Sequence, residues 1–125
     1  DVSLSSDGSI VAYGAFRHDS VKGHVRVFEN VSGTWTQLGA DIDGANNGDR
    51  SGWALDLSSD GLTVAIGSYA NDENGVLSGE SRVFTYENSA WSQKGGDIQG
   101  LAAGDIAGQA VALSTDGSIL AVGAY

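Results

Sequence analysis

The chain of 125 residues has no cysteine, no proline and no methionine, and only six lysines and arginines against sixteen aspartates and glutamates. Without cysteine, neither a disulfide nor thiol chemistry is available. The net charge of −10 argues against a nucleic-acid partner, because such binding requires cationic patches. No apolar run approaches the roughly 18 residues of a membrane-spanning segment, so no membrane insertion is expected.

Glycine is abundant, with nineteen residues, and acidic side chains are spread along the chain. Since proline is absent, we expect the tight turns to be made by glycine. A strongly acidic surface is typical of a soluble surface protein or of one that collects divalent cations.

One short motif occurs three times, at residues 2–8, 55–61 and 111–117: an alternating apolar run that ends in Ser/Thr-Asp-Gly. Its aspartates, Asp7, Asp60 and Asp116, are spaced by 53 and 56 positions. A period near 50 residues with short alternating apolar runs is typical of a β-propeller blade. We therefore predict an all-β fold of propeller blades, each a four-stranded antiparallel sheet, with about two and a half blades in the chain.

The predicted repeats span residues 1–52, 53–108 and 109–125, and the third holds only the first half of a blade. Ten strands are expected, at 2–5, 10–15, 24–30 and 34–39, at 53–58, 63–69, 80–87 and 90–95, and at 110–114 and 119–124. The second strand of each repeat carries Ala-x-Gly, whose small side chains are predicted to let neighbouring sheets approach closely. The first two repeats differ in length only between that strand and the third.

The half repeat predicts a role in assembly. Two and a half blades cannot close a ring, and the last strand would leave an open edge. We expect either a segment of a longer repeat protein or copies that complete one another, with the open edge pairing by strand addition.

Taken together, the motifs resemble a known repeat. Gly-Asp-x-x-Gly, Ser-x-Asp-Gly, Ala-x-Gly-Ala, Gly-x-x-Arg-Val-Phe and Trp-x-Gln-x-Gly-x-Asp-Ile follow one another along the chain. This order is similar to the FG-GAP-type repeat of integrin-α-like propellers, in the variant of long secreted repeat proteins. The Phe-Gly and Gly-Ala-Pro hallmarks are only half matched, as in Tyr13-Gly14-Ala15.

The resemblance implies an extracellular or cell-surface module that is structural or adhesive and not an enzyme. Such a module would be a subunit or segment of a filament or appendage, with other proteins or copies of itself as partners. The alternative is a carbohydrate-binding or hydrolytic propeller, whose axial site would be built from blades not present here.

One loop collects oxygen ligands of the kind that Ca²⁺ prefers, close together and with glycines between them: Asp41, Asp43, Asn46, Asn47 and Asp49. The second repeat keeps only Asp97 and Asp105 at the corresponding positions. Aspartates required in every repeat are also expected to fix turns by accepting backbone N–H bonds. A calcium site and a turn therefore remain two interpretations of this loop. A second acidic segment, Asn71–Gly75, is expected to be a solvated rim loop.

Three further residue types invite functional interpretations. Asn30-Val31-Ser32 is an acceptor sequence for an N-linked glycan. Trp35 and Trp91 are predicted to pack between neighbouring sheets. Trp53 aligns with Gln109, which makes it the candidate for contact with a ligand or partner.

The arginines, histidines and other potentially catalytic residues do not form a pattern that predicts an active site. Arg26 and Arg82 recur on the third strand and are expected to pair with a repeated carboxylate such as Asp49 or Asp105. The run 18–20 reads His-Asp-Ser, but adjacent residues of one loop cannot adopt the geometry of a catalytic triad. No enzyme is therefore predicted.

Overall fold

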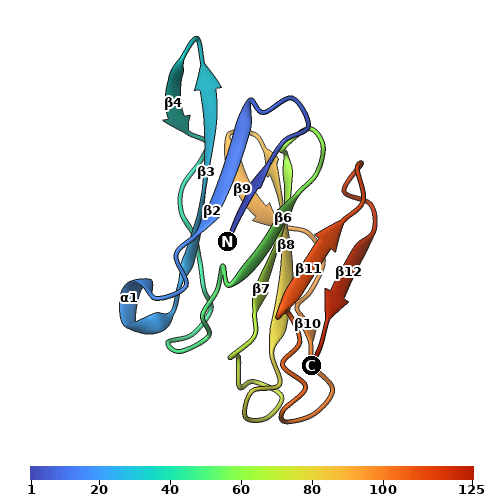
Figure 1. Cartoon of the computed structure of the whole chain (residues 1–125). Coiled ribbons are helices and arrows are strands. Elements are labelled where there is room, and N and C mark those ends of the chain that lie inside the picture. Colours follow the sequence, from blue (N-terminus) through green and yellow to red (C-terminus); the bar gives the residue numbers. More distant parts are fainter.

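The computed structural model describes residues 1–125 as an all-β protein, with 46% of residues in strands and 3% in a helix. Two antiparallel sheets and one hairpin stand side by side, and none closes into a ring or barrel (Figure 1). Sheet 1 contains β1 (Val2–Leu4), β2 (Ile10–Gly14), β3 (His24–Val31), β4 (Thr34–Gln37) and β5 (Ile42–Asp43). Sheet 2 contains β6 (Ala54–Leu57), β7 (Thr63–Ser68), β8 (Glu80–Glu87), β9 (Ala90–Gln93) and β10 (Ile98–Gln99), and hairpin 3 contains β11 (Ala110–Leu113) and β12 (Leu120–Gly123).

Both sheets are meanders in which consecutive strands pair, in the order β1-β2-β3-β4 and β6-β7-β8-β9. Hairpin 3 repeats the first two strands of this order. The only helical segment is the four-residue turn α1 (His18–Val21), and no helix is long and apolar enough to cross a membrane. The predicted antiparallel strands are therefore confirmed in type and order.

The number of strands differs from the prediction, twelve instead of ten, because the fourth strand of each sheet is interrupted. Phe28 pairs with Gln37 and Val25 pairs with Ile42, so two residues of β3 face the four residues 38–41. The same excess lies at residues 94–97 of sheet 2. Such a bulge bends the strand and re-aims its side chains. It places Asp41 and Asp97 beside the third strand.

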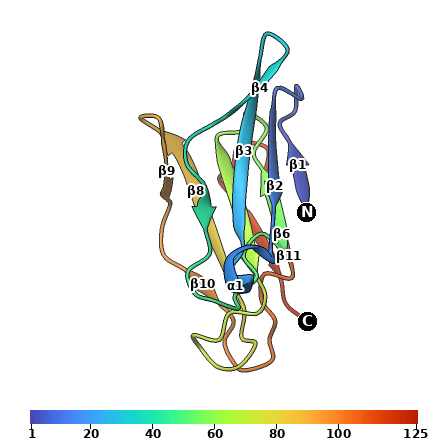
Figure 2. The same ribbon diagram turned by 90° about the vertical axis from the view of Figure 1, so that its left-hand side faces the viewer.

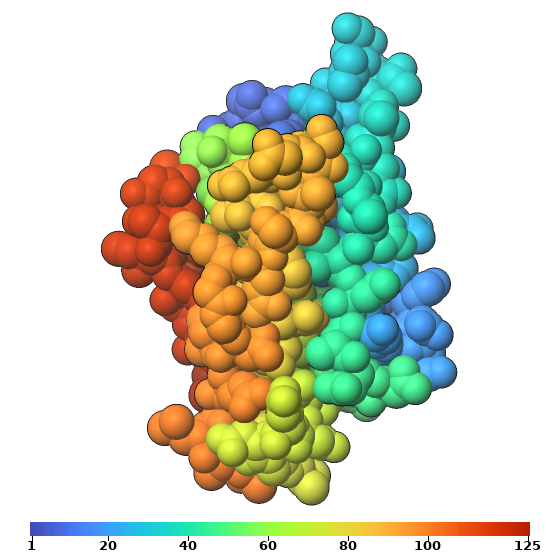
Figure 3. Space-filling view, turned by 180° about the vertical axis from the view of Figure 1, so that it is seen from behind, coloured from blue at the N-terminus to red at the C-terminus, as the bar shows by residue number.

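Sheets 1 and 2 pack face to face over an apolar core. Period-two alternation puts Ile10 and Ala12 of β2 on the face toward sheet 2, and Val64 and Ile66 of β7 on the face toward sheet 1. The other buried members of the core are Val25, Val27, Ile42, Leu55 and Leu57. Figure 3 shows the two sheets and the hairpin lying against one another in chain order, and Figure 2 views the same stack from the side of sheet 1.

Burial differs between equivalent strands of the two sheets. Every residue of β7 is buried, whereas only Ile10 and Ala12 are buried in β2. Sheet 1 covers one face of sheet 2 and hairpin 3 covers part of the other, so β7 has neighbours on both faces. The outer face of β2 has no neighbour in this chain.

Two glycines lie in close contact with backbone, but their partner is a loop and not the neighbouring sheet that the sequence predicts. A Cβ on Gly14 would overlap the carbonyl oxygen of Gly52, and a Cβ on Gly67 would overlap that of Gly108. The close partner in each case is the loop that leads into the next sheet. The turn glycine Gly61 also abuts β2, because a Cβ there would lie 2.7 Å from Ile10.

Side-chain hydrogen bonds link the first strands in a repeated pattern. The Ser3 hydroxyl accepts the Leu57 backbone N–H at 3.1 Å. At the equivalent position, Asp56 Oδ2 accepts the Leu113 N–H at 2.8 Å. The Ser59 carbonyl also accepts the Ser6 N–H at 2.9 Å across the same interface. The same stacking geometry is therefore used twice.

The Ser/Thr-Asp-Gly turns are held by their aspartates. The Ser9 backbone N–H, and then the hydroxyls of Ser9 and Ser5, donate to Asp7 and lower its pKa to about 2. Hydrogen bonds from Ser114 and Ser118 likewise lower the pKa of Asp116 to about 2. The turn is thus built in the same way at both ends of the chain.

We expect Gly67→Ala to lower the free energy of unfolding by about 1–3 kcal/mol, the usual cost of overpacking. The added methyl group would overlap the Gly108 carbonyl, which is backbone and cannot move aside cheaply. Gly96→Ala is the matched control, since nothing lies within 4 Å of its Cβ. Urea unfolding measures both variants. Equal stability of the two would contradict the close approach.

We expect the turn at Asp7 to contribute to acid sensitivity. Its folded pKa of about 2 lies below the ordinary 3.8, so the stabilisation is complete above about pH 4 and is lost as the pH falls toward 2. Asp7→Asn keeps an acceptor oxygen but cannot titrate. The difference in melting temperature between wild type and variant should shrink from pH 6 to pH 2, and a difference that does not depend on pH would disprove the assignment.

Candidate functional site

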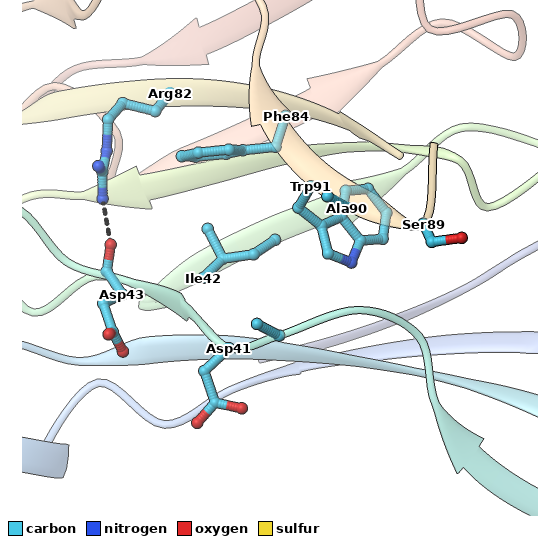
Figure 4. Close-up of a pocket in the computed structure, with 9 residues that line it drawn as sticks. Asp41, Ile42, Asp43, Arg82, Phe84, Ser89, Ala90 and Trp91 are labelled. Carbon is cyan, nitrogen blue, oxygen red and sulfur yellow. Dashed lines mark hydrogen bonds between the residues drawn. The ribbon is translucent and has the colours of Figure 1, made fainter. Parts of the chain in front are cut away.

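A hollow of about 270 Å³ opens at the rim between sheets 1 and 2. Ile42 of β5, Phe84 of β8 and Trp91 of β9 gather around it, and Arg82 lies at one end (Figure 4). Arg82 Nη2 donates to the Asp43 carbonyl at 2.9 Å and so ties the two sheets together there. The Trp91 indole N–H donates to the Leu38 carbonyl at 2.6 Å. The hollow is therefore part of the packing between the sheets, with an apolar floor and one cation.

Asp41, the first predicted calcium ligand, is occupied by other partners. Arg26 Nε and Nη2 donate to its two carboxylate oxygens, each at 2.8 Å, and Gln37 Nε2 donates at 2.7 Å. The Arg26 and Gln37 hydrogen bonds hold the pKa of Asp41 at about 2. A bidentate ion pair of this kind fixes the bulge of sheet 1 to β3.

Arg26 pairs with a repeated carboxylate, as predicted, but neither arginine pairs with the predicted examples Asp49 and Asp105. Arg26 pairs with Asp41 and not with Asp49, because the bulge brings Asp41 beside β3. Arg82 does not repeat this pairing: its Nε lies 3.1 Å from Glu80 Oε1, two residues away on β8. Asp97, the equivalent of Asp41, is left with Gln93, whose Nε2 donates to Oδ1 at 2.7 Å.

The five predicted calcium ligands lie in two places. Asp41 and Asp43 come together with His24, with one possible ligand atom from each within 4.8 Å of the others. Asn46, Asn47 and Asp49 line a separate hollow of about 380 Å³. Its opposite wall is formed by Asp72 and Glu73 of the predicted rim loop. The two acidic segments of the sequence therefore meet in space.

Asp49 and Asp105 each hold a turn. Asp49 Oδ2 accepts the Asn46 N–H at 2.8 Å, and Asp105 Oδ2 accepts the N–H groups of Leu101 and Ala102 at 2.8 and 2.9 Å. These are the backbone bonds of the turn interpretation. Asp49 is buried and Asp105 half-buried.

Glu80 is a functional candidate that the sequence analysis missed. It opens β8, its side chain is fully buried, and neither carboxylate oxygen has a hydrogen-bond partner. The nearby Arg82 Nε forms an ion pair without hydrogen-bond geometry. Burial raises the pKa of Glu80 to about 7, against the opposing effect of Arg82. The signal in the sequence is a polar residue at the start of the third strand, where sheet 1 has His24.

His24 is buried in the same way. Its Nδ1 has no partner, and burial lowers the pKa of its imidazole. The His18 ring lies 4.3 Å from the His24 ring, in an edge-on contact. His18, Asp19 and Ser20 all lie in the single turn α1, as the sequence predicts for one loop.

Trp53 is exposed and lies in an aromatic cluster formed by loop residues next to the ends of the strands. Its ring makes edge contacts with Phe16 and Tyr69, at centroid distances of 5.0 and 4.8 Å. Arg17 lies over the Phe16 ring and Arg50 over the Tyr69 ring, and Arg50 also donates to the Tyr69 hydroxyl. These residues and Val21 line an open hollow of about 560 Å³. Neither arginine forms an ion pair with a carboxylate.

The two repeated tryptophans have different surroundings. Trp91 packs against the core between the sheets, as predicted. Trp35, its equivalent in sheet 1, is 47% exposed because no sheet lies against that face. Asn30 is exposed near the tip of the β3–β4 hairpin, where its Oδ1 accepts the Gly33 N–H at 2.8 Å.

No protein-family model matches the chain, and no curated protein matches its sequence.

We expect Asp105→Ala to lower the free energy of unfolding by about 1–3 kcal/mol, because two N–H groups lose a charged acceptor. Asp105→Asn should cost less, since its amide oxygen still accepts. The measurement is urea unfolding in EDTA. A loss that appears only when calcium is added would instead identify Asp105 as a metal ligand.

Proposed function

We propose that the chain is a non-enzymatic module of β-propeller blades that assembles by packing blade against blade. Sheets 1 and 2 are the complete blades and hairpin 3 is the inner half of another. The proposal is supported by the two successive interfaces, which use equivalent residues and equivalent hydrogen bonds. Repeats of this kind gain stability mainly from contacts with their nearest neighbours.

The main observation that supports the proposal is the exposed outer face of sheet 1. Val2 and Leu4 are 62% and 58% exposed, whereas their equivalents in sheet 2, Leu55 and Leu57, are 4% and 6% exposed. Sheet 1 itself covers Leu55 and Leu57. The outer face therefore repeats a surface that is buried elsewhere in the same molecule. Its members are Val2, Leu4, Val11, Tyr13, Phe28 and Trp35.

The other end of the molecule presents the complementary residues. Ile119 and Ala121 of hairpin 3 occupy the positions of Ile10 and Ala12, which pack against the next sheet. Ile119 is 68% exposed. A second copy would thus dock its hairpin 3 on the outer face of sheet 1. Such a head-to-tail contact builds a ring if its rotation closes and a filament if it does not.

The unpaired edge of β12 offers a second contact. In sheets 1 and 2 a third strand pairs with the second strand at this edge. In hairpin 3, β12 pairs only with β11. An added strand from a partner would satisfy its free backbone groups. Edge pairing and face packing would then act together.

The wider role is part of the same proposal. We place the module outside the cell or at its surface, as a structural or adhesive part of a filament or appendage, with Asn30 as the acceptor of an N-linked glycan. This rests on the resemblance of the repeats to integrin-α-like blades. The exposed hairpin tip at Asn30 is compatible with an attached glycan.

Carbohydrate binding is the second candidate function. The open hollow beside Trp53 combines exposed aromatic surface with two arginines free of carboxylate partners. Such a site suits an acidic sugar, because the arginines would pair with its carboxylate while the rings contact its apolar face. Trp53→Ala should abolish binding to an acidic polysaccharide if this function is correct.

Light scattering tests the assembly. We expect the molar mass of the wild type to exceed that of one chain and to rise with concentration. Leu4→Lys and Ile119→Lys should each reduce it to a monomer, because each places a charge in the contact. Leu101→Lys is the control, at a residue that is 91% exposed and outside both faces.

Mixing the two monomeric variants sharpens the test. Leu4→Lys keeps a working hairpin 3 and Ile119→Lys keeps a working sheet 1 face, so together they should form a dimer that grows no further. A wild type that stays monomeric at millimolar concentration, or a mixture that stays monomeric, would contradict head-to-tail packing.

A further inference from the structure

Glu80 is an unusual group to find in this position. Its side chain is fully buried, and both carboxylate oxygens lack hydrogen-bond partners. Its only close cation is Arg82, whose Nε lies 3.1 Å from Oε1. Burying a carboxylate without hydrogen bonds costs free energy. A buried carboxylate of this kind therefore indicates a further binding partner.

Two more carboxylates converge on Glu80 from other segments. Glu73 comes from the loop between β7 and β8, and Asp97 from the bulge before β10. One oxygen from each of the three carboxylates lies within 4.8 Å of the others. Three carboxylates at this spacing repel one another, and the single charge of Arg82 offsets only part of that repulsion.

Glu73 and Asp97 each accept a hydrogen bond from an amide side chain. Gln99 Nε2 donates to Glu73 Oε2 at 2.7 Å, and Gln93 Nε2 donates to Asp97 Oδ1 at 2.7 Å. Each bond uses one oxygen and leaves the other without a partner. Neighbours that orient a ligating carboxylate in this way are typical of metal sites.

Sheet 1 shows why the cluster belongs to sheet 2 alone. There the position of Glu80 is taken by His24, and both oxygens of Asp41 are held by Arg26. The three-residue extension of the second repeat falls in the loop that carries Glu73. In sheet 2, Arg82 pairs with Glu80 and leaves Asp97 free of an arginine.

We propose that Glu73, Glu80 and Asp97 bind one divalent hard cation, Ca²⁺ in an extracellular setting. The set is all oxygen, which favours Ca²⁺ over the metals that prefer nitrogen or sulfur ligands. Further oxygens, including water, complete the six to eight ligands that Ca²⁺ takes. The cation neutralises the buried carboxylate and fastens the β7–β8 loop to β8 and to the bulge. The site does not involve the faces used in assembly.

Isothermal titration with calcium chloride in metal-free buffer tests the site. We expect the wild type to bind one Ca²⁺ with a dissociation constant of roughly 10⁻⁴–10⁻³ M, the range of extracellular modules. Glu73→Gln, Glu80→Gln and Asp97→Asn should each weaken binding by about tenfold or more. Glu87→Gln is the matched control, because Glu87 is an exposed carboxylate at the far end of the same strand.

Thermal unfolding with and without calcium provides the second readout. Calcium should raise the melting temperature of the wild type and of Glu87→Gln, and should raise that of Glu73→Gln and Asp97→Asn clearly less. Both of those positions are exposed, so the variants should fold even if Glu80→Gln does not. No heat and no thermal shift at about 10 mM calcium, or binding unchanged in Glu73→Gln and Asp97→Asn, would overturn the proposal.

Discussion

The face-to-face contact between sheets is the interaction on which this structure depends. Both faces of sheet 2 are buried, since Val64 and Ile66 of β7 point to sheet 1 while the alternate residues Thr63, Ala65 and Gly67 point to the side of hairpin 3. A single sheet of this kind cannot bury its own surface, so it needs a neighbour on each side. Sheet 2 has both neighbours and its central strand is wholly buried. Sheet 1 has one, and its outer apolar residues remain exposed.

Much of this arrangement could be predicted from the sequence, because it depends on local rules. The Ser/Thr-Asp-Gly turns mark where strands end, and the period-two alternation shows which residues share a face of the sheet. Gly14 and Gly67 could be identified as sites of close approach because a strand interior otherwise disfavours glycine. These features recur at fixed spacing, and this recurrence distinguishes them from turns and glycines that occur by chance.

The side-chain pairings could not be predicted in the same way. The bulge at residues 38–41 changes which carboxylate faces Arg26, and nothing in the spacing of the residues reveals its size. Glu80 has the polarity of a surface residue, yet the packing of the sheets buries it completely. The acidic loops at Asp49 and Glu73 are 24 positions apart in the sequence and meet only because successive sheets lie side by side. Where neighbouring sheets meet, the tertiary geometry determines which side chains pair and which are buried.

Every strand pairing in the molecule lies within one repeat, and each sheet touches only the next one along the chain. The structure is therefore a one-dimensional series, in which stability is close to a sum of units and their junctions. A duplication of one whole repeat would bring its own pairings and its own docking surfaces with it. Such a chain can change length in evolution by whole repeats without redesigning any contact that it already has.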